Sequence, residues 1–327
     1  MRGFNLKMVS KLMFVFVFLV GTFVIYPTSS NDQTSAAATS VFDAFLTIKG
    51  SKQGLIKGDS MVRGYEKSIE VTDFELNGEI PTDDRNLPNG PLEQRLTITK
   101  YVDKATPSLL KAFSTNENVT EFTMTVTKPQ GAVSGKKWYE LKLRNATISS
   151  QKLTVVDGRC MEVLEFDSAQ TAEITYDNTI ISQGAVSGIN SYLKLEGNTQ
   201  GMIKGASINK DTKDQIAISN FNYSSSIDDI QSRPSYDAIQ IDKLIDKSTP
   251  LLWNAIKNNE TLKMFQLSLL KRQAANLPPS YNKVNLTKAV LISYTITPDS
   301  EKLLFGYKKL SYDSGDGNIV DIDLQQP

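Results

Sequence analysis

The sequence of 327 residues contains no histidine and a single cysteine, Cys160. Without histidine the chain cannot build a Ser-His-Asp triad, a Cys-His dyad or a His-ligated metal site. One cysteine also excludes an intramolecular disulfide, so core packing must stabilise the fold. We expect Cys160 itself to be a small, partly buried hydrophobic residue. These absences leave only carboxylate-based mechanisms open, and we expect a non-catalytic protein without a metal or cofactor.

Clustered positive charge is also lacking, because 36 Lys and Arg residues are balanced by 36 Asp and Glu residues. A nucleic-acid partner, which needs a basic surface, is therefore not expected. Two acidic segments remain. Asp83 and Asp84 lie in a loop rich in Gly, Pro and Asn, where adjacent charges are solvated. Residues 312–319 place glycines where a calcium loop needs ligands, which favours a hairpin turn.

The N-terminal segment, residues 1–38, has the pattern of a signal peptide and flexible leader. Arg2, Lys7 and Lys11 precede an apolar run over residues 12–26, and Pro27 ends it. These fifteen residues, apolar except for Gly21 and Thr22, form a helix of about 22 Å, which is shorter than the roughly 30 Å hydrocarbon core of a membrane. We expect a secreted or periplasmic protein if the segment is cleaved, and a membrane-anchored one if it is retained.

The rest of the chain contains the same domain twice. FLTIKGSKQGLIKGDS at 45–60 returns as YLKLEGNTQGMIKGAS at 192–207, with eight of sixteen positions identical. KYVDKATPSLLKAF at 100–113 returns as KLIDKSTPLLWNAI at 243–256, with seven of fourteen identical. Internal repeats set the architecture before any fold is assigned. We name residues 42–178 repeat one and residues 191–327 repeat two, joined by a linker at 179–190.

Alternating apolar residues predict that each repeat is built of antiparallel strands. In repeat one, Ile69 and Val71 are followed by Phe74 and Leu76, a slip of one residue that recurs at the matching point of repeat two. Such a slip predicts a β-bulge near residues 72–73 and 219–220. Six or seven strands in about 140 residues suit a closed barrel or a sandwich. The glycines of the first repeated block are predicted to be turn glycines.

One short helix is predicted in each repeat. Thr106 and Thr249 are expected to be N-cap residues, each followed by a proline, Pro107 or Pro250, at the first helical position. Leu110 and its counterpart Trp253 are candidate helix anchors. Trp253 is either a core residue, which we favour, or an interface residue.

The order of these elements around the D-K-[AS]-T-P block resembles the hemolysin-coregulated protein family, Hcp, of type VI secretion. The resemblance covers nearly all of repeat one; in repeat two it is clearest at 192–223, at 243–256 and in the closing KKLSYDSGDGNIVDIDL. It implies an all-β fold with one short helix per domain, as two tandem antiparallel six-stranded β-barrels. It also implies self-assembly into rings that stack as tubes, here with three chains completing six barrels, and contacts with secretion-system components or effectors.

Two features depart from that family pattern: tube subunits are typically single domains, and they leave the cell without a signal peptide. We therefore keep a second hypothesis, a secreted binding module or effector that contacts a host or surface partner through the loops 77–94 and 224–238. Asp103 and Lys104, repeated as Asp246 and Lys247, are signature residues in either case. They either bracket the turn into the helix or form a ring or stacking contact.

Overall fold

The computed structural model describes residues 42–128, 135–168, 170, 172–177, 191–208, 210–228, 233–270, 280–315 and 318–324. The predicted leader at 1–38 and the predicted linker at 179–190 lie outside these residues. None of the helices in the described ranges is long and apolar enough to cross a membrane.

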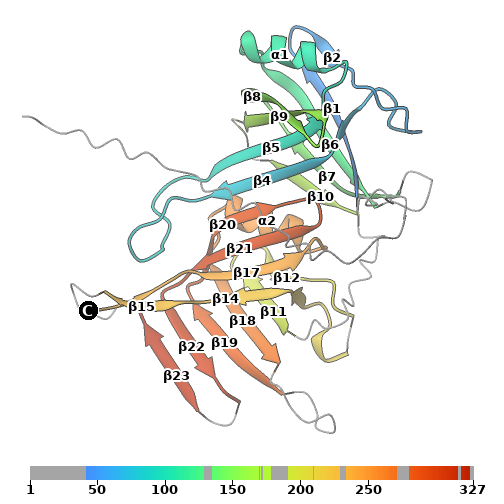
Figure 1. The fold of residues 1–327 in the computed structure, drawn as a ribbon. Coiled ribbons are helices and arrows are strands. Elements are labelled where there is room, and N and C mark those ends of the chain that lie inside the picture. Colours follow the sequence, from blue (N-terminus) through green and yellow to red (C-terminus); the bar gives the residue numbers. More distant parts are fainter. Residues whose placement is uncertain are drawn as a thin grey trace, which may run out of the picture. The chain divides into compact units, whose positions relative to one another are not determined.

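Repeat one is built of strands with one helix between the fifth and sixth strand (Figure 1). Its elements are β1 (Asp43–Gly50), β2 (Gly54–Ile56), β3 (Ile69–Val71), β4 (Asp73–Glu79), β5 (Glu93–Tyr101), α1 (Thr106–Ser114), β6 (Val119–Thr127), β7 (Lys137–Leu143), β8 (Ala146–Val156), β9 (Arg159–Ser168) and β10 (Glu173–Tyr176).

Repeat two follows the same order, with a short 3-10 helix, a two-stranded hairpin and a final strand in addition to the shared elements. Its elements are β11 (Ser191–Gly197), β12 (Gly201–Ile203), η1 (Lys210–Thr212), β13 (Ile216–Ile218), β14 (Asn220–Asn222), β15 (Ser225–Asp228), β16 (Arg233–Tyr236), β17 (Ile239–Leu244), α2 (Thr249–Lys257), β18 (Leu262–Leu270), β19 (Tyr281–Thr287), β20 (Val290–Ile296), β21 (Ser300–Gly306), β22 (Lys309–Asp313) and β23 (Ile319–Asp323).

The all-β class with one α-helix per repeat is confirmed, but the sheets are not closed barrels. In repeat one, β1 pairs with β3 and β6, and β4, β5, β9 and β8 follow as neighbours. The circuit is weak where β6 meets β8, because only Val119 and Ala146 pair there. In repeat two the same junction is an isolated bridge between Thr261 and Val290, and the strands of this repeat lie in three sheets, one of which is the β15–β16 hairpin. The hydrogen-bonded ladders therefore stop short of closure.

The predicted bulge lies at Thr72 in repeat one and at Ser219 in repeat two. The amide and hydroxyl of Thr72 both donate to the carbonyl of Thr99, at 2.8 and 2.9 Å. Those of Ser219 donate to the carbonyl of Asp242 in the same way, at 2.8 and 3.0 Å. In each repeat, the two hydrogen bonds to one carbonyl accommodate the extra residue of the bulge. After the bulge, the apolar residues of the strand face the core again.

The repeated glycines are turn glycines with separate physical reasons. Gly54 and Gly201 have φ angles of 68° and 73°, a left-handed conformation that other residues adopt only with strain. At Gly50, a Cβ would collide with the carboxylate of Glu117. That carboxylate accepts the amides of Lys52 and Gln53, at 2.5 and 2.8 Å, and so holds the turn.

Candidate functional site: the joint between the repeats

In each repeat, a buried ion pair contacts the turn formed by the D-K-[AS]-T-P block. In repeat one, Lys100 Nζ on β5 lies 2.7 Å from a Glu162 oxygen on β9 and 2.8 Å from Asp103 Oδ1. In repeat two, Lys243 pairs with Glu301 and lies 3.1 Å from Asp246 Oδ1. All four lysine and glutamate side chains are buried. Because an unpaired buried charge is strongly unfavourable, each pair fixes the register of its two strands and the start of the helix.

The sequence carries a signal for these buried pairs outside the D-K-[AS]-T-P block. On β5, the inward positions Leu96 and Ile98 are followed by Lys100, and on β17 Ile239 and Ile241 are followed by Lys243. A lysine at an inward apolar position in both copies predicts a buried acidic partner.

The predicted threonine N-caps are wrong by one residue. The N-cap residues are Ala105 and Ser248, and neither makes a side-chain cap. The hydroxyl of Thr106 instead donates to Glu162 at 2.7 Å and accepts the Asp103 amide at 3.2 Å. Thr249 accepts the Asp246 amide in the same way, at 3.1 Å. The hydroxyls are used inside the buried network, where a carboxylate is the stronger acceptor.

The other signature residues separate into two roles. Pro107 and Pro250 lie in the first turn of their helices, as predicted. Lys104 points to the surface and pairs with Asp59 at 3.0 Å, and Lys247 pairs with Asp214 at 2.7 Å. Asp103 and Asp246 thus belong to the buried network, whereas the adjacent lysines form surface ion pairs. Among the described residues, no group of three Cys, Asp or Glu side chains is placed to hold a metal ion.

The strongest candidate for a functional surface is the joint through which repeat one contacts repeat two. Strand β4 of repeat one pairs with β20 of repeat two, from Leu76 opposite Ile296 to Glu79 opposite Ser293. The amide of Ile80 extends this contact to the carbonyl of Ile292 at 2.8 Å. The pairing merges strands of both repeats into one 14-stranded sheet. Edge pairing of this kind satisfies the backbone groups of both strands.

Helix α2 of repeat two closes the joint through Trp253. The indole Nε1 donates to the carbonyl of Ala172 in repeat one at 2.7 Å. A Cβ on Gly78 of β4 would lie 3.0 Å from the indole ring, so the glycine makes room for the ring. Trp253 is 1% exposed. It is therefore a buried residue, as favoured from the sequence, and its burial comes partly from the contact between the two repeats of one chain.

The counterpart of Trp253 behaves differently. Leu110 of α1 is 51% exposed, although it was predicted to share the buried face of its helix. Leu153 of β8 and Ile296 of β20 also correspond, because each pairs with the buried glutamate of its repeat. Leu153 is 59% exposed and Ile296 is 1% exposed. The surface that repeat two buries in the joint is thus open in repeat one.

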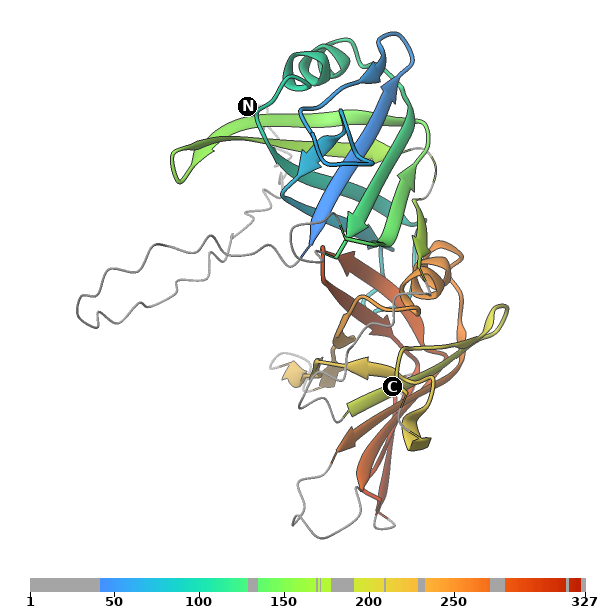
Figure 2. The same cartoon turned by 90° about the vertical axis from the view of Figure 1, so that its right-hand side faces the viewer.

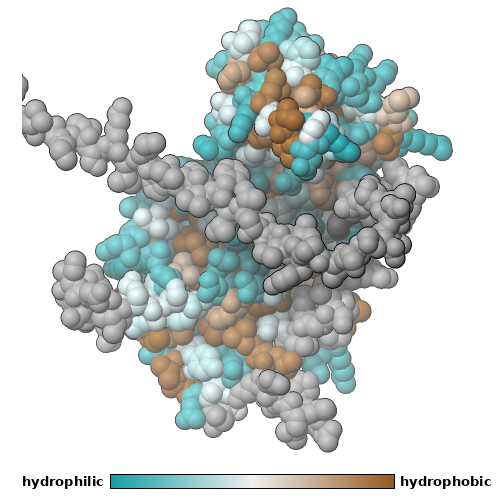
Figure 3. Space-filling view, in the orientation of Figure 1, coloured by the Kyte–Doolittle hydropathy of each residue, from teal (hydrophilic) through white to brown (hydrophobic). Residues whose placement is uncertain are grey.

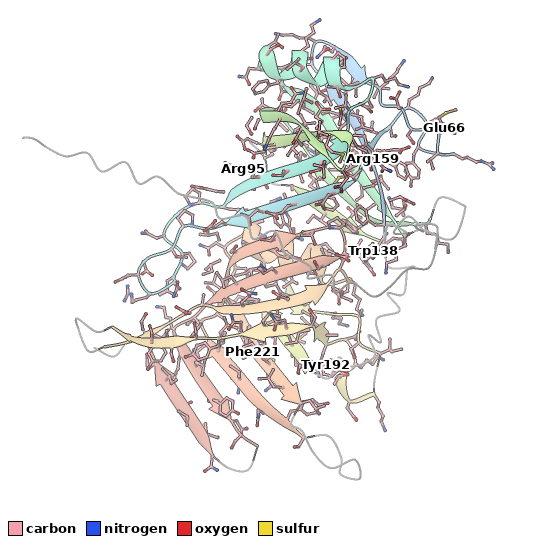
Figure 4. The ribbon with its side chains drawn as sticks, in the orientation of Figure 1. Glu66, Arg95, Trp138, Arg159, Tyr192 and Phe221 are labelled. Carbon is pink, nitrogen blue, oxygen red and sulfur yellow. The ribbon has the colours of Figure 1, made fainter. Side chains whose placement is uncertain are left out.

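That open surface extends along the β8–β9 hairpin, which reaches out from repeat one (Figure 2). Val155 and Val156 near its tip are exposed, and so is Cys160, which corrects the prediction that this cysteine is partly buried. At the start of β9, Arg159 donates to the hydroxyl of Tyr101 at 2.8 Å (Figure 4). Figure 3 shows hydrophobic residues at the surface of repeat one.

Loop and tyrosine contacts complete the joint. The hydroxyl of Tyr139 in repeat one donates to the carbonyl of Pro298 at 2.9 Å. Burial raises the pKa of Tyr139 well above its usual value, and the nearby carboxylate of Asp299 adds to this effect. The loop after β4 also reaches repeat two, where Asn86 Nδ2 donates to the carbonyl of Tyr236 at 3.2 Å. Both loops assigned to an outside partner in the second hypothesis therefore contact each other.

Comparison with known proteins identifies the family of both repeats. The family model described as "Type VI secretion system effector, Hcp" matches residues 45–181 and 192–313. The chain belongs to the Hcp family. The two matched segments also confirm the tandem duplication.

Individual relatives of this Hcp-family chain each match about one repeat. The "Major exported protein" of Pseudomonas aeruginosa is 30% identical over 116 residues, which cover 32% of this chain and 67% of the relative. Among solved structures, the secreted protein Hcp3 of Pseudomonas aeruginosa has 22% identity and a TM-score of 0.37, covering 41% of this chain and 99% of its own. The Hcp1 protein of E. coli EAEC 042 has 25% identity and a TM-score of 0.38, covering 42% and 92%.

Proposed function

We propose that the chain is an exported structural protein of type VI secretion that supplies two adjoining domains of an Hcp ring. Three chains then provide six domains, and the protein performs no catalysis. The observation that carries this proposal is the joint itself. Repeat one contributes β4 and the β10 side, whereas repeat two contributes β20 and α2. A contact between two different surfaces of homologous domains repeats around an axis and closes a ring when the rotation permits.

Each chain has a further pair of surfaces of the same two kinds. Repeat one has β8 and α1, which match β20 and α2. Repeat two has β14, an edge strand of the sheet, and β15, which match β4. Transferring the register of the joint places Leu153 of one chain opposite Tyr223 of the next. Contacts between chains then copy the contact within each chain.

Export of the chain is supported by two independent features. The signal-like segment at 1–38 carries a positive start and a short apolar run. The curated relative from Pseudomonas aeruginosa is itself named a major exported protein. N-terminal sequencing of the protein recovered from the periplasm and from the medium tests whether the segment is cleaved. Recovery in the cytoplasm alone would contradict export.

Native mass spectrometry and negative-stain microscopy of the chain over a range of concentrations test ring formation. We expect particles of three chains with six domains around a central opening. Leu153→Asp places a charge in the contact between chains and should abolish these particles. Leu55→Asp is the matched control, because Leu55 is half-exposed and lies on β2, which is not one of the strands of the joint surfaces. The proposal fails if no three-chain particle forms, either in the wild type or in the variant Ile322→Pro, in which strand β23 is expected to detach from β22.

A further inference from the structure

Strand β23 occupies, on repeat two, the place that α2 occupies on repeat one. We propose that the outer edge of β22 is a docking edge for the α1–β8 surface of a second copy of the chain, and that β23 covers this edge until assembly. The inference rests on the proposed ring and adds a condition to it: strand β23 must detach from β22 before two chains join.

The outer edge of β10 defines the docking edge in repeat one. The amide of Asp177 donates to the carbonyl of Trp138, which makes these two residues a hydrogen-bonded pair of the β7–β10 ladder. Such pairs alternate along antiparallel strands, so Glu173 and Thr175 face β7 and the backbone of Ala172 faces away from it. The outward carbonyl of Ala172 is the acceptor that Trp253 uses in the joint.

The matching carbonyl in repeat two belongs to Leu310. Glu173 pairs with Lys142 in repeat one, and Ser311 pairs with Asn285 in repeat two. Lys142 and Asn285 correspond, because they stand opposite Thr123 and Gln266 in their repeats. Ala172 and Leu310, one residue earlier on each strand, therefore correspond as well.

In the folded chain, strand β23 donates a hydrogen bond to this carbonyl of Leu310. The amide of Leu324 donates to the carbonyl of Lys308 at 3.0 Å, and the amide of Ser314 donates to that of Asn318 at 3.1 Å. The alternation between these two bonds makes Leu310 and Ile322 a hydrogen-bonded pair. The Ile322 amide thus occupies the acceptor that an approaching helix needs, and the backbone of β23 fills the space beside it.

The attachment of β23 suits a segment that can be released. It is the last strand of its sheet and pairs on one side only, over five residue pairs. Ile319 and Val320 are more than half exposed, and the ion pair from Lys309 to Asp321 is long, at 3.8 Å, and solvated. Of the described residues 318–324, Ile322 and Leu324 pack partly against the core. Edge strands with few buried contacts open at low free energy.

The internal joint indicates that a second copy of the chain binds the outer edge of β22. The internal joint shows which surface fits this kind of edge: a helix placed as α2 and a strand placed as β20. Repeat one carries both elements, with Leu110 and Leu153 exposed where Trp253 and Ile296 are covered. These exposed apolar positions correspond to the positions that are buried in the contact between the two repeats of one chain.

Two proline variants of the full-length chain test the cap. Ile322→Pro removes the amide that β23 donates to Leu310 and should detach the strand. Asp321→Pro is the matched control, because Asp321 stands opposite Ser311 in a non-hydrogen-bonded pair and its amide points away from β22. We expect Ile322→Pro to form three-chain particles at a concentration lower by on the order of tenfold or more, with the control unchanged. Circular dichroism and thermal unfolding check that both variants remain folded.

An engineered disulfide that holds β23 against β22 tests the opposite condition, in which the edge stays covered. Ser311→Cys with Asp321→Cys, in a Cys160→Ser background, places a disulfide across a non-hydrogen-bonded pair, where the spacing suits it. The oxidised protein should stay a single chain, and reduction should restore wild-type assembly. Adding Leu153→Asp to Ile322→Pro should remove the gain, which ties the freed edge to the α1–β8 surface. If the locked and released forms assemble equally into rings, the cap is wrong and the ring stands. If neither assembles, the ring proposal fails as well.

Discussion

Helices α1 and α2 have almost the same sequence pattern and opposite surroundings. Leu109 and Leu252 at the first shared apolar position are both buried. At the next position Leu110 is exposed, whereas Trp253 is buried against β4 and Ala172 of repeat one. Burial at this position is set by whether another domain lies beside the helix, not by the helix. The difference separates what each repeat needs to fold from what it needs to associate.

The features that the two copies share belong to folding. Each repeat has the bulge, the glycine turn and the buried lysine–glutamate pair in the same places. The features that differ gather at the joint and at the edges that match it. Substitutions at matched positions can therefore test this division directly.

Replacement of Trp253, the anchor of α2, should have one of the largest effects on stability. We expect Trp253→Ala to lower the free energy of unfolding by about 3–5 kcal/mol, since a large buried side chain is removed. Leu110→Ala, at the matched and exposed position, should change it by less than about 0.5 kcal/mol. Urea unfolding followed by circular dichroism measures both. Equal losses in the two variants would show that Leu110 and Trp253 contribute equally to stability, which would contradict the difference in their burial.

The indole hydrogen bond can be separated from the packing by Trp253→Phe. This variant leaves the Ala172 carbonyl without its donor and should lose about 1–3 kcal/mol, less than the alanine variant. A loss as large as that of alanine would mean that the ring is not retained in its site.

The buried pairs should respond alike in the two repeats. Lys243→Met leaves the buried carboxyl group of Glu301 without its lysine partner, and Lys100→Met does the same to Glu162, so each variant should lose about 3–5 kcal/mol of stability. Glu301→Leu combined with Lys243→Met should recover part of this loss, because no uncompensated charge remains. Thermal and urea unfolding of the three variants provide the comparison. A harmless Lys100→Met would mean that the shared network stabilises only repeat two.

The sequence was sufficient for the features that one repeat specifies alone. Strand alternation, the slip at Thr72 and Ser219, and the proline at each helix start come from local patterns, and the duplication itself was visible by alignment. The exposure of Leu110 and the paired edges of β4 and β20 could not be predicted, because they depend on how one folded domain meets another. The N-cap error has a similar origin: the Thr106 hydroxyl bonds to Glu162, a residue distant in the sequence.

A smaller effect is expected where β4 approaches the indole. Gly78→Val places a branched side chain 3.0 Å or less from the ring of Trp253 and should lose about 1–3 kcal/mol through overpacking. Ser225→Val is the matched control, since Ser225 is the exposed counterpart in repeat two and should change stability by less than about 0.5 kcal/mol. Unfolding curves recorded side by side decide between the two. A tolerated Gly78→Val would show that the joint can widen without loss.

The smallest effect concerns how the stability of the joint falls with pH above pH 10. Burial raises the pKa of Tyr139 above its unfolded value of 10, so the folded state keeps this proton while the unfolded state releases it. The contribution is fully present below pH 10 and is lost as the pH rises further, by up to about 1.4 kcal/mol per pH unit. Tyr139→Phe should lose about 0.5–1.5 kcal/mol at neutral pH, with its bond to Pro298, and should decline less steeply above pH 10. Tyr294→Phe, at a tyrosine of repeat two whose pKa is likewise raised by burial, gives the same change of slope without removing a bond between the repeats. If Tyr139→Phe keeps the wild-type slope, the hydroxyl is not buried in solution and the joint is open at that point.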